Sequence, residues 1–301
     1  MSSSDWWRSS RSNVDPMGLR FGIHSGPQNA SGFAEYLSIW QYAEEVGLDW
    51  ASVFDHFQPI QSDQDGPCYE GFTMLAAMAA HTSRLACGII VSGVTYRHPA
   101  VVAKMAATID HISGGRMEFG VGAAWNEDEH GEYGIPFPRI GVRMDMLDEA
   151  CHVMRALWTE PRANFTGEHY TLTDARCEPK PVQERMPLWI GGSGEKRTLR
   201  IVAEHATGWN TFHGDPAEYR HKLDVLERHC EAVGRDPGEI RKQIVARGPL
   251  TSDEEAQRLA EAMLPHKAMG VEDFLISARP PADRRTIELF ARVVGRAVRG
   301  A

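Results

Sequence analysis

The chain has 301 residues, of which 42% are hydrophobic and 24% are charged, and its formal net charge is −9. This composition is typical of a soluble globular protein, and the acidic balance argues against a nucleic-acid partner, which needs a basic surface. The longest apolar stretches are far below the roughly 18 residues of a membrane span, so we expect no membrane partner. Five cysteines without a C-x-x-C spacing (Cys68, Cys87, Cys151, Cys177 and Cys230) predict reduced thiols, a cytoplasmic location and no zinc site.

Strand and helix patterns alternate along the chain. Residues 1–16 lack the apolar region of a secretory signal and predict a flexible extension before a single domain at 17–301. The expected strand and helix pairs are 19–24 and 33–46, 48–54 and 72–81, 85–92 and 99–112, 117–121 and 144–158, 188–190 and 199–205, 208–212 and 219–233, 243–247 and 254–269, and 274–277 and 286–298. Eight such units favour an α/β fold of the (β/α)8 TIM-barrel type. The alternative, a doubly wound sheet, lacks its glycine fingerprint after the first strand.

Two long connections interrupt the regular spacing and predict insertion loops. One follows the second strand, at about 57–70, and the other follows the fourth strand and includes 126–140 and 162–186. Long loops in compact domains are usually lids or binding loops. The segment 165–172 alternates around a glycine and predicts a small hairpin. The acidic residues between 127 and 132 are interpreted as a solvated loop face.

Asp55 and His56 follow the second strand, at the barrel end where chemistry is normally performed. An imidazole in that place exchanges a proton near neutral pH. The structural alternative is a pair that only caps a turn. His24, at the end of the first strand, faces the same expected mouth and is a candidate substrate-pocket residue, although a single histidine in a loop is more often structural.

Two glycine-rich segments also lie at expected strand ends. After the fourth strand, small residues would let a flat ligand approach the backbone, with Trp125 stacking on it or forming a wall. After the strand at 188–190, consecutive glycines and a helix start predict a phosphate cradle. In both cases the alternative is ordinary barrel packing or an ordinary turn. The cofactor candidates from these segments are Gly122, Ala123, Trp125, Asn126, Gly191, Gly192, Ser193, Gly194, Lys196 and Arg197.

Arg97 and His98 lead out of the third strand and are further cofactor candidates. Their cationic and imidazole groups could reach a polar part of a cofactor. The alternative for His98 is that it caps the helix that begins at Pro99.

The order and spacing of these segments resemble the luciferase-like monooxygenase superfamily, and more narrowly its coenzyme F420-dependent oxidoreductases. The segments that carry the resemblance are 44–49 with Asp55-His56-Phe57, 94–99, 112–116, 120–127, 133–138, 187–194 and 206–210. The resemblance implies a TIM barrel with the cofactor at its carboxyl-terminal mouth. It also implies His56 beside the deazaflavin, a non-prolyl cis peptide near Ile89–Ile90 behind the ring, and the cofactor phosphate near Gly191–Gly194.

One departure from the family is visible. A sugar-phosphate dehydrogenase branch carries a glutamate after the glycines of the fourth strand, and this chain has Trp125 there. This difference argues against a sugar-phosphate substrate and against a direct copy of that branch's acid–base pair, so that His56 would act without that glutamate.

We therefore expect an F420-dependent oxidoreductase that moves a hydride between the deazaflavin C5 and a small alkene, carbonyl or alcohol. His56 would exchange the proton, Asp55 would set its tautomer or the loop shape, and His24, Trp125 and Trp209 would line the substrate pocket. An FMN-dependent monooxygenase that uses reduced flavin and oxygen is the alternative, and a non-catalytic cofactor-binding barrel is a second. The resemblance also implies a homodimer.

Overall fold

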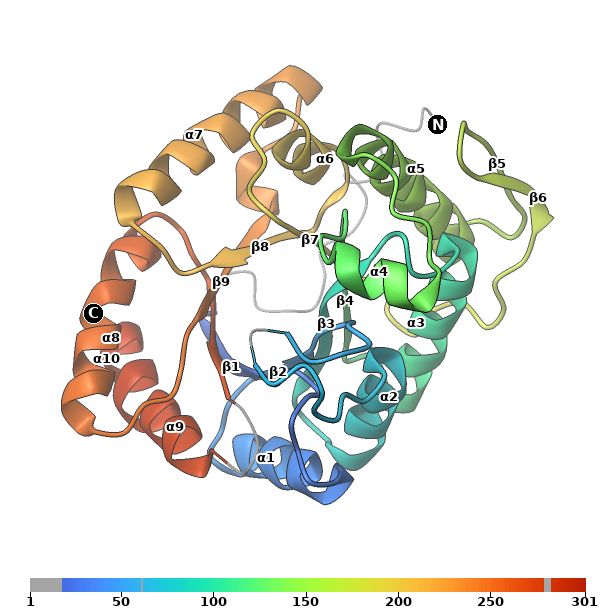
Figure 1. Ribbon diagram of the computed structural model, residues 1–301. Helices are drawn as coiled ribbons and strands as arrows, with labels where there is room; N and C mark the ends of the chain where they lie inside the picture. Colours follow the sequence, from blue (N-terminus) through green and yellow to red (C-terminus); the bar gives the residue numbers. More distant parts are fainter. Residues whose placement is uncertain (1–17, 61, 279–282) are drawn as a thin grey trace.

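The computed structural model describes residues 18–60, 62–278 and 283–301, so the predicted extension at 1–16 lies outside the described residues. Eight parallel strands close into a barrel in the order β1-β2-β3-β4-β7-β8-β9-β10 (Figure 1). Their bounds are β1 (Arg20–His24), β2 (Trp50–Val53), β3 (Ala86–Gly93), β4 (Met117–Gly122), β7 (Leu188–Gly191), β8 (Gly208–Phe212), β9 (Arg241–Ala246) and β10 (Asp273–Ser277). The prediction of a TIM barrel is confirmed.

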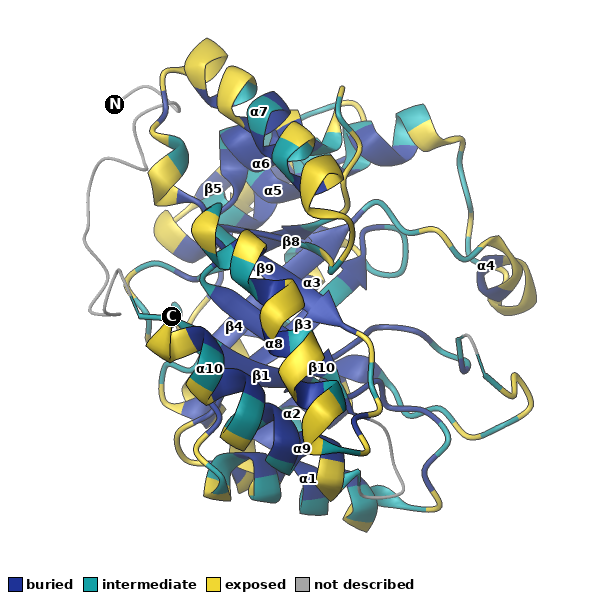
Figure 2. Cartoon of the chain, turned by 90° about the vertical axis from the view of Figure 1, so that its left-hand side faces the viewer, coloured by how far each residue is buried: buried dark blue, intermediate teal, exposed yellow. Residues whose placement is uncertain are grey.

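Helices surround the barrel and turn their buried faces toward it (Figure 2). They are α1 (Phe33–Glu45), α2 (Gly71–His81), α3 (Pro99–Ser113), α5 (Ile140–Thr159), α6 (Thr198–His205), α7 (Pro216–Val233), α8 (Asp253–Ala268), α9 (Arg284–Leu289) and α10 (Gly295–Gly300), with a π-helical segment at Phe290–Val294. Local sequence fixes several helix ends: α7 starts at Pro216 behind the capping Asp215 and stops at Gly234, whose φ is 69°. None of the described helices is both long enough and apolar enough to cross a membrane.

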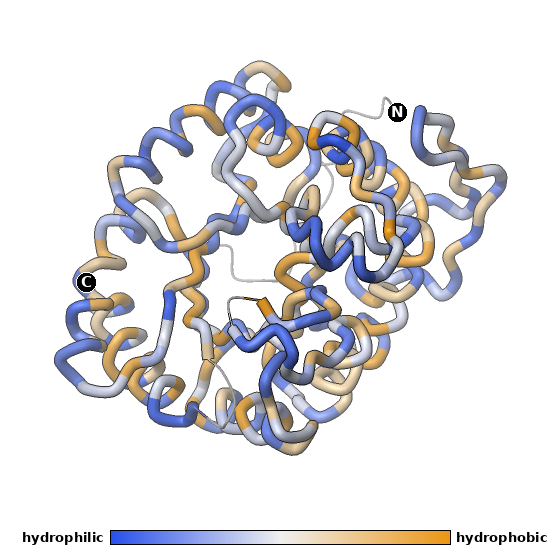
Figure 3. Tube along the Cα trace, in the orientation of Figure 1, coloured by the Kyte–Doolittle hydropathy of each residue, from blue (hydrophilic) through white to orange (hydrophobic). Residues whose placement is uncertain are grey.

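Hydrophobic residues concentrate on the strands and on the helix faces that cover them (Figure 3). Inside the barrel a separate cluster contains Trp50, Ile90, Trp189, Val245 and Leu275. The indoles of Trp50 and Trp189 meet edge to face with their centroids 5.4 Å apart. This cluster fills the interior of the barrel, and cavities open at both ends of it.

Two connections carry additional structure. The segment between β2 and α2 spans 54–70, and the segment between β4 and β7 contains α4 (Glu127–Tyr133), α5 and the antiparallel pair β5 (Ala163–Thr166) and β6 (Thr171–Ala175). The hairpin predicted at 165–172 is confirmed. The acidic run forms the helix α4 and not a loop; Glu127, Asp128 and Glu132 are exposed as expected, but Glu129 is completely buried. In Figure 2, α4 stands off the barrel end toward which the strand arrows point.

Candidate active site

A cavity of about 390 Å³ opens at the carboxyl ends of the strands. Its size is at the lower end of the range for small-molecule sites. The ends of β1, β3 and β8 reach it together with the segments that follow β2, β3, β4 and β7. This is the barrel end at which TIM-barrel enzymes hold their active sites.

His56 lines this cavity and is bonded to a buried carboxylate. Its Nδ1 lies 2.8 Å from Oε2 of Glu129, a residue of α4 whose side chain has no exposed surface. Because the carboxylate accepts, Nδ1 carries the hydrogen and Nε2 keeps the lone pair. The glutamate of the sugar-phosphate branch is absent at position 125, but His56 has a different carboxylate partner, Glu129, from the acidic run that was interpreted as a solvated loop face.

Glu129 is held ionised by its hydrogen-bond donors. Burial alone would raise its pKa, but bonds from His56, the Tyr96 hydroxyl and the amide of Phe57 together keep that pKa below its usual range. The Tyr96 hydroxyl donates to Oε2 at 2.5 Å, and burial and the Glu129 charge raise the pKa of Tyr96. The site thus contains a histidine whose tautomer is fixed by a hydrogen bond to an ionised carboxylate.

His130 anchors α4, the helix that carries Glu129. Its Nδ1 donates to the carbonyl of Asn126 at 2.6 Å, and its Nε2 is 2.6 Å from the hydroxyl of Thr95. Its ring stacks on Tyr96 with the centroids 4.8 Å apart. Asn126, a predicted cofactor residue, does not line the cavity; it contributes this carbonyl at the start of α4.

Asp55 lines the cavity, but its carboxylate is bonded to other residues of the protein. Its Oδ2 accepts from the Ser92 hydroxyl at 2.6 Å and from Arg97 Nη1 at 2.7 Å, while Oδ1 is buried without a hydrogen-bond partner among the described residues. Burial raises the pKa of Asp55, although Arg97 and Ser92 favour its ionised form. Asp55 therefore shapes the loop, and Glu129 sets the tautomer of His56.

Arg97 and His98, both predicted to reach the cofactor, lie outside the cavity lining. Arg97 joins Asp55 to Glu70 by two ion pairs of 2.7 and 2.6 Å. His98 caps α3 by accepting from the amide of Ala100 at 3.2 Å, which is the alternative stated for it. The guanidinium of Arg97 is therefore paired with two carboxylates, and the imidazole of His98 caps a helix.

The back wall of the cavity is flat and built from small residues. An added Cβ on Gly191 would meet Val91 Cγ1 at 2.9 Å, and one on Gly122 would meet Val91 Cγ2 at 3.0 Å. A non-prolyl cis peptide joins Ile90 to Val91, one residue beyond the expected position. Ile90 lines the cavity, whereas Ile89 is fully buried in the core outside it. The absence of side chains at the two glycines therefore lets β4 and β7 lie close to Val91 at this wall.

Only part of the predicted phosphate cradle borders the cavity. Gly191, Gly192 and Ser193 line it together with Thr198, whereas Gly194, Lys196 and Arg197 do not. Arg197 forms an ion pair with Asp145 and donates to the carbonyl of Gly141 at 3.0 Å. Ser193 and Thr198 are therefore the hydroxyl-bearing residues of this turn and helix start that border the cavity.

Trp209 is not a pocket residue, although sequence reasoning placed it there. Its side chain is fully buried and stacks on Tyr219 with a centroid distance of 5.3 Å. Its indole N–H donates to the carbonyl of Gly192 at 2.7 Å, and the Gly192 amide donates to the carbonyl of Asn210 at 3.2 Å. Trp209 therefore supports the glycine loop from behind.

The mouth of the cavity combines predicted and unpredicted residues. His24 lines it and lies 3.0 Å from the hydroxyl of Ser52, and Trp125 lines it with its ring centroid 5.4 Å from that of His56. Ala123 also borders the cavity. Sequence reasoning missed the lining residues Phe54, Ile60, Tyr96, Ile140, Met144, Thr198 and Phe212. In the sequence these residues occupy positions typical of an ordinary core or loop, and no local motif marks them as cavity-lining residues.

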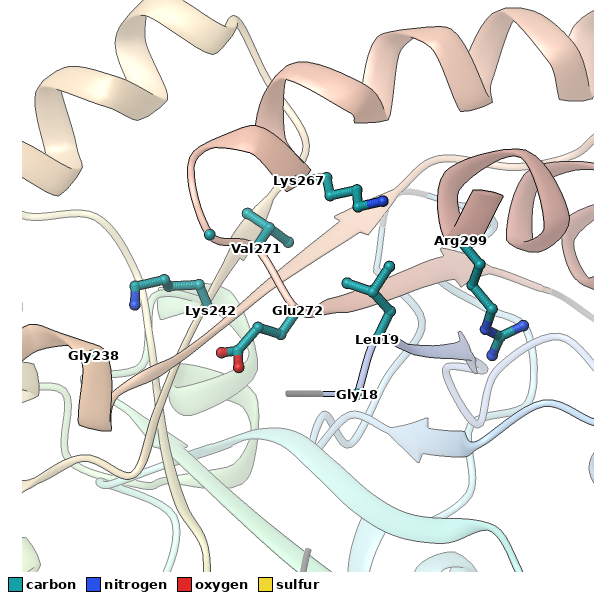
Figure 4. Close-up of a pocket in the computed structure, with 9 residues that line it drawn as sticks. Gly18, Leu19, Gly238, Lys242, Lys267, Val271, Glu272 and Arg299 are labelled. Carbon is teal, nitrogen blue, oxygen red and sulfur yellow. The ribbon is translucent and has the colours of Figure 1, made fainter. Parts of the chain in front are cut away.

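A second cavity, of about 760 Å³, opens at the amino ends of the strands (Figure 4). Its cationic groups do not converge, and each donates to the protein: Lys242 to the carbonyl of Pro237, Lys267 to that of Val298, and Arg299 to Asp49. This cavity also borders Gly18, the first described residue. The described side chains around this cavity therefore do not form a catalytic or anion-binding group.

One cluster between α5 and α6 has ligand types that suit a metal ion. The candidate ligand atoms of Asp148, His152 and His205 all lie within 4.8 Å of one another. His205 is already bonded to Asp148 at 2.8 Å and to the guanidinium of Arg155 at 3.0 Å. A cation in contact with the central imidazole disfavours a metal ion there.

Residues 17–296 match the family described as luciferase-like monooxygenase. An uncharacterized protein of Mycobacterium tuberculosis is 34% identical over 199 residues, which cover 66% of this chain and 68% of that protein. An F420-dependent glucose-6-phosphate dehydrogenase of Nakamurella multipartita is 31% identical over 287 residues, covering 92% of this chain and 83% of that protein.

A solved structure also shares the fold. An F420-dependent secondary alcohol dehydrogenase in complex with an F420-acetone adduct matches with a TM-score of 0.81 and 21% sequence identity. The match covers 94% of this chain and 99% of that one. At this identity the likeness shows the fold alone.

Proposed function

The chain belongs to the luciferase-like monooxygenase family, and from this premise we propose that it is an F420-dependent oxidoreductase. The reaction would move a hydride between the deazaflavin and a small alkene, carbonyl or alcohol. The observation that carries the proposal is the His56–Glu129 pair at the wall of the carboxyl-end cavity. The relative in Nakamurella multipartita, whose name gives F420 as its cofactor, supports the choice of cofactor.

The residues present fit a planar cofactor. Val91, Gly122 and Gly191 would lie against the ring, and the hydroxyls of Ser193 and Thr198 with nearby backbone amides would hold the phosphate. When bound, F420 supplies the hydride chemistry at C5, and the protein supplies orientation and a site with little water.

His56 exchanges the proton that accompanies the hydride. With Nδ1–H donated to Glu129, Nε2 is the basic atom and takes the hydroxyl proton of an alcohol substrate. The Glu129 carboxylate then stabilises the imidazolium that forms. In the direction of reduction, the same Nε2 returns the proton to the developing alkoxide or carbanion.

Titration of the purified protein with F420, reduced F420 and FMN tests the cofactor. We expect F420 to bind, with a change in its fluorescence and visible absorbance, and FMN to bind at least about tenfold more weakly. The reverse preference would favour the alternative that the family name carries, a monooxygenase that uses reduced flavin and oxygen.

Replacement of His56 tests whether the barrel is catalytic. We expect His56→Ala to lower kcat by about 10²-fold or more with little change in the Kd of F420, since general acid–base catalysis contributes roughly 10²–10⁴-fold. Unchanged turnover in His56→Ala would remove the catalytic assignment and leave the cofactor assignment standing. Binding of F420 without any turnover by the wild-type protein would favour a non-catalytic barrel.

A further inference from the structure

Asn210 brings a carboxamide into the carboxyl-end cavity from β8. Its neighbour Trp209 points outward and stacks on Tyr219 of α7. Successive side chains of a strand point to opposite faces, so the side chain of Asn210 points into the barrel. It lines the cavity and is only 8% exposed. A polar group in so enclosed a place needs hydrogen-bond partners.

The flat back wall of the cavity lies between Asn210 and His56. Around the barrel this wall belongs to β3, β4 and β7, with β2, which His56 follows, on one side and β8 on the other. Gly191, which forms part of the wall, is the register partner of Asn210. Neighbouring strands lie about 4.8 Å apart, so the carboxamide stands at the edge of the surface proposed for the cofactor ring.

Gln243 on β9 holds the carboxamide of Asn210 in place. Nδ2 of Asn210 donates to Oε1 of Gln243 at 2.7 Å, and the two residues are register partners. A carboxamide has two N–H donors and one acceptor oxygen, and this bond uses one donor. The second N–H and Oδ1 of Asn210 have no hydrogen-bond partner among the described residues. Asn210 therefore keeps an acceptor and a donor for a ligand.

The burial of Gln243 shows that this arrangement is costly. Gln243 has no exposed surface, and its Nε2 has no hydrogen-bond partner among the described residues. An unpaired buried nitrogen destabilises a folded protein. An apolar side chain of similar size would fill the same space without that loss. The glutamine thus indicates that the orientation of Asn210 has a use.

We propose that Asn210 binds the pyrimidinedione edge of the cofactor ring, with Oδ1 accepting the hydrogen of the imide nitrogen N3, and that Gln243 positions it. This inference rests on the proposed function and deepens it. The pyrimidinedione ring of a deazaflavin carries an N–H between two carbonyls, which is a donor that suits Oδ1. The cofactor phosphate, an acceptor, would be repelled by Oδ1 and has its own donors at Ser193 and Thr198.

Binding of 8-hydroxy-5-deazariboflavin and of its N3-methyl derivative tests the proposal, because the methyl group removes the one hydrogen in question. The wild-type protein should bind the N–H compound at least about tenfold more tightly, since methylation leaves Oδ1 buried and unpaired. In Asn210→Leu this preference should fall to within about twofold, because the acceptor is gone. Leucine is close to asparagine in size, so a preference caused by the bulk of the methyl group would persist. Fluorescence titration gives each Kd without turnover.

Two further variants separate recognition from a general disturbance of the fold. Asn164→Leu is the matched control, because Asn164 is exposed on β5 and lies outside the cavity lining. It should keep the wild-type preference for the N–H compound. Gln243→Leu releases Asn210 without removing it, so its preference should lie between those of the wild type and Asn210→Leu. A variant that only loosened the fold would weaken both compounds alike and leave the preference unchanged.

Failure of the inference is distinguishable from failure of the proposed function. Equal binding of the two compounds by the wild-type protein would overturn the inference, and this comparison needs no variant to fold. An undiminished preference in Asn210→Leu would overturn it too, since another group would then recognise the N–H. In both cases binding of F420 keeps the proposed function. If the wild-type protein binds neither F420 nor the two compounds, the proposed function is overturned and the inference with it.

Discussion

Glu129 has two roles in the proton chemistry proposed for His56, since it fixes the imidazole tautomer and balances the imidazolium charge. Glu129→Gln keeps the size of the side chain and removes its charge. We expect kcat to fall by roughly 10–100-fold, as is usual when the carboxylate partner of a functional histidine is lost, with the Kd of F420 unchanged. Steady-state kinetics and the F420 titration measure the two quantities.

Glu132→Gln is the control for this substitution, because Glu132 lies exposed on the same helix. It should leave kcat unchanged. Equal loss in both variants would mean that α4 tolerates no change of charge, and the special role of Glu129 would be refuted.

The lowered pKa of Glu129 also predicts how stability depends on pH. Its folded-state pKa lies below the roughly 4.3 of an unperturbed glutamate. The stabilisation is therefore fully present above that unfolded value and is lost as the pH falls through the folded-state value. The difference in unfolding free energy between wild type and Glu129→Gln should be constant from pH 7 to 6 and shrink below about pH 4. Urea unfolding at these pH values tests it, and a difference that grew on acidification would contradict it.

Some of these residue roles could be read from the sequence, and others could not. His56 was found because a histidine after a barrel strand has a recognisable position. Its partner was hidden, since Glu129 is 73 residues away and sits in a run of acids that looks solvated. Arg97 was misjudged for the related reason that its carboxylate partners become neighbours only on folding.

At the scale of elements, the flat back wall depends on the absence of side chains at β4 and β7. Gly191→Ala would place a Cβ 2.9 and 3.0 Å from the two methyl groups of Val91. Because Val91 is β-branched and stiff, we expect a stability loss of about 1–3 kcal/mol and at least about tenfold weaker F420 binding. Denaturant unfolding and the fluorescence titration are the measurements.

Gly141→Ala provides the comparison, since an added Cβ there meets nothing within 4 Å and Gly141 is the second residue of α5. It should change stability by less than about 1 kcal/mol, in the stabilising direction. If both alanine variants bound F420 like the wild type, the proposed position of the planar ring would be wrong.

Most elements were predictable because their signals are local. Buried parallel strands are short apolar runs, and the predicted strand at 208–212 agrees with β8 residue for residue. The helix α4 was missed because its seven residues include four acids and its stability comes from contacts of His130 and Glu129 with other segments. A continuous final helix at 286–298 was also too simple, because a π-helical segment divides it.

At the scale of the whole molecule, the two ends of the barrel have different duties. The carboxyl end holds the cavity, and the amino end holds an ion network in which Arg20 contacts Glu118 and Asp273 while Arg241 also contacts Asp273. Asp273 is 1% exposed and Glu118 7%. These ion pairs at the amino end stabilise the fold, and they lie at the opposite end of the barrel from the proposed active site.

Arg20→Met should therefore destabilise the protein by about 3 kcal/mol or more, because it leaves the buried Glu118 without a cation and Asp273 with Arg241 alone. Arg200→Ala removes an exposed i,i+4 pair with Glu204 and should cost only about 0.3–0.5 kcal/mol. Urea unfolding of both variants at pH 7 measures the contrast. Similar losses in the two variants would show that the buried network contributes no more to stability than an exposed surface pair does.

The homodimer remains a prediction, which analytical sedimentation would test.

The position of Glu129 on α4 has a consequence for how proteins with this barrel evolve. The imidazole lies in the segment that follows β2, but its acid arrives on the connection between β4 and α5, which contributes no strand to the barrel. Exchange of this one segment would supply a different partner to the same histidine while leaving the eight-stranded frame intact. Descendants of one barrel can thereby diverge in reactivity by inheriting a new connection, with no need to rebuild the scaffold.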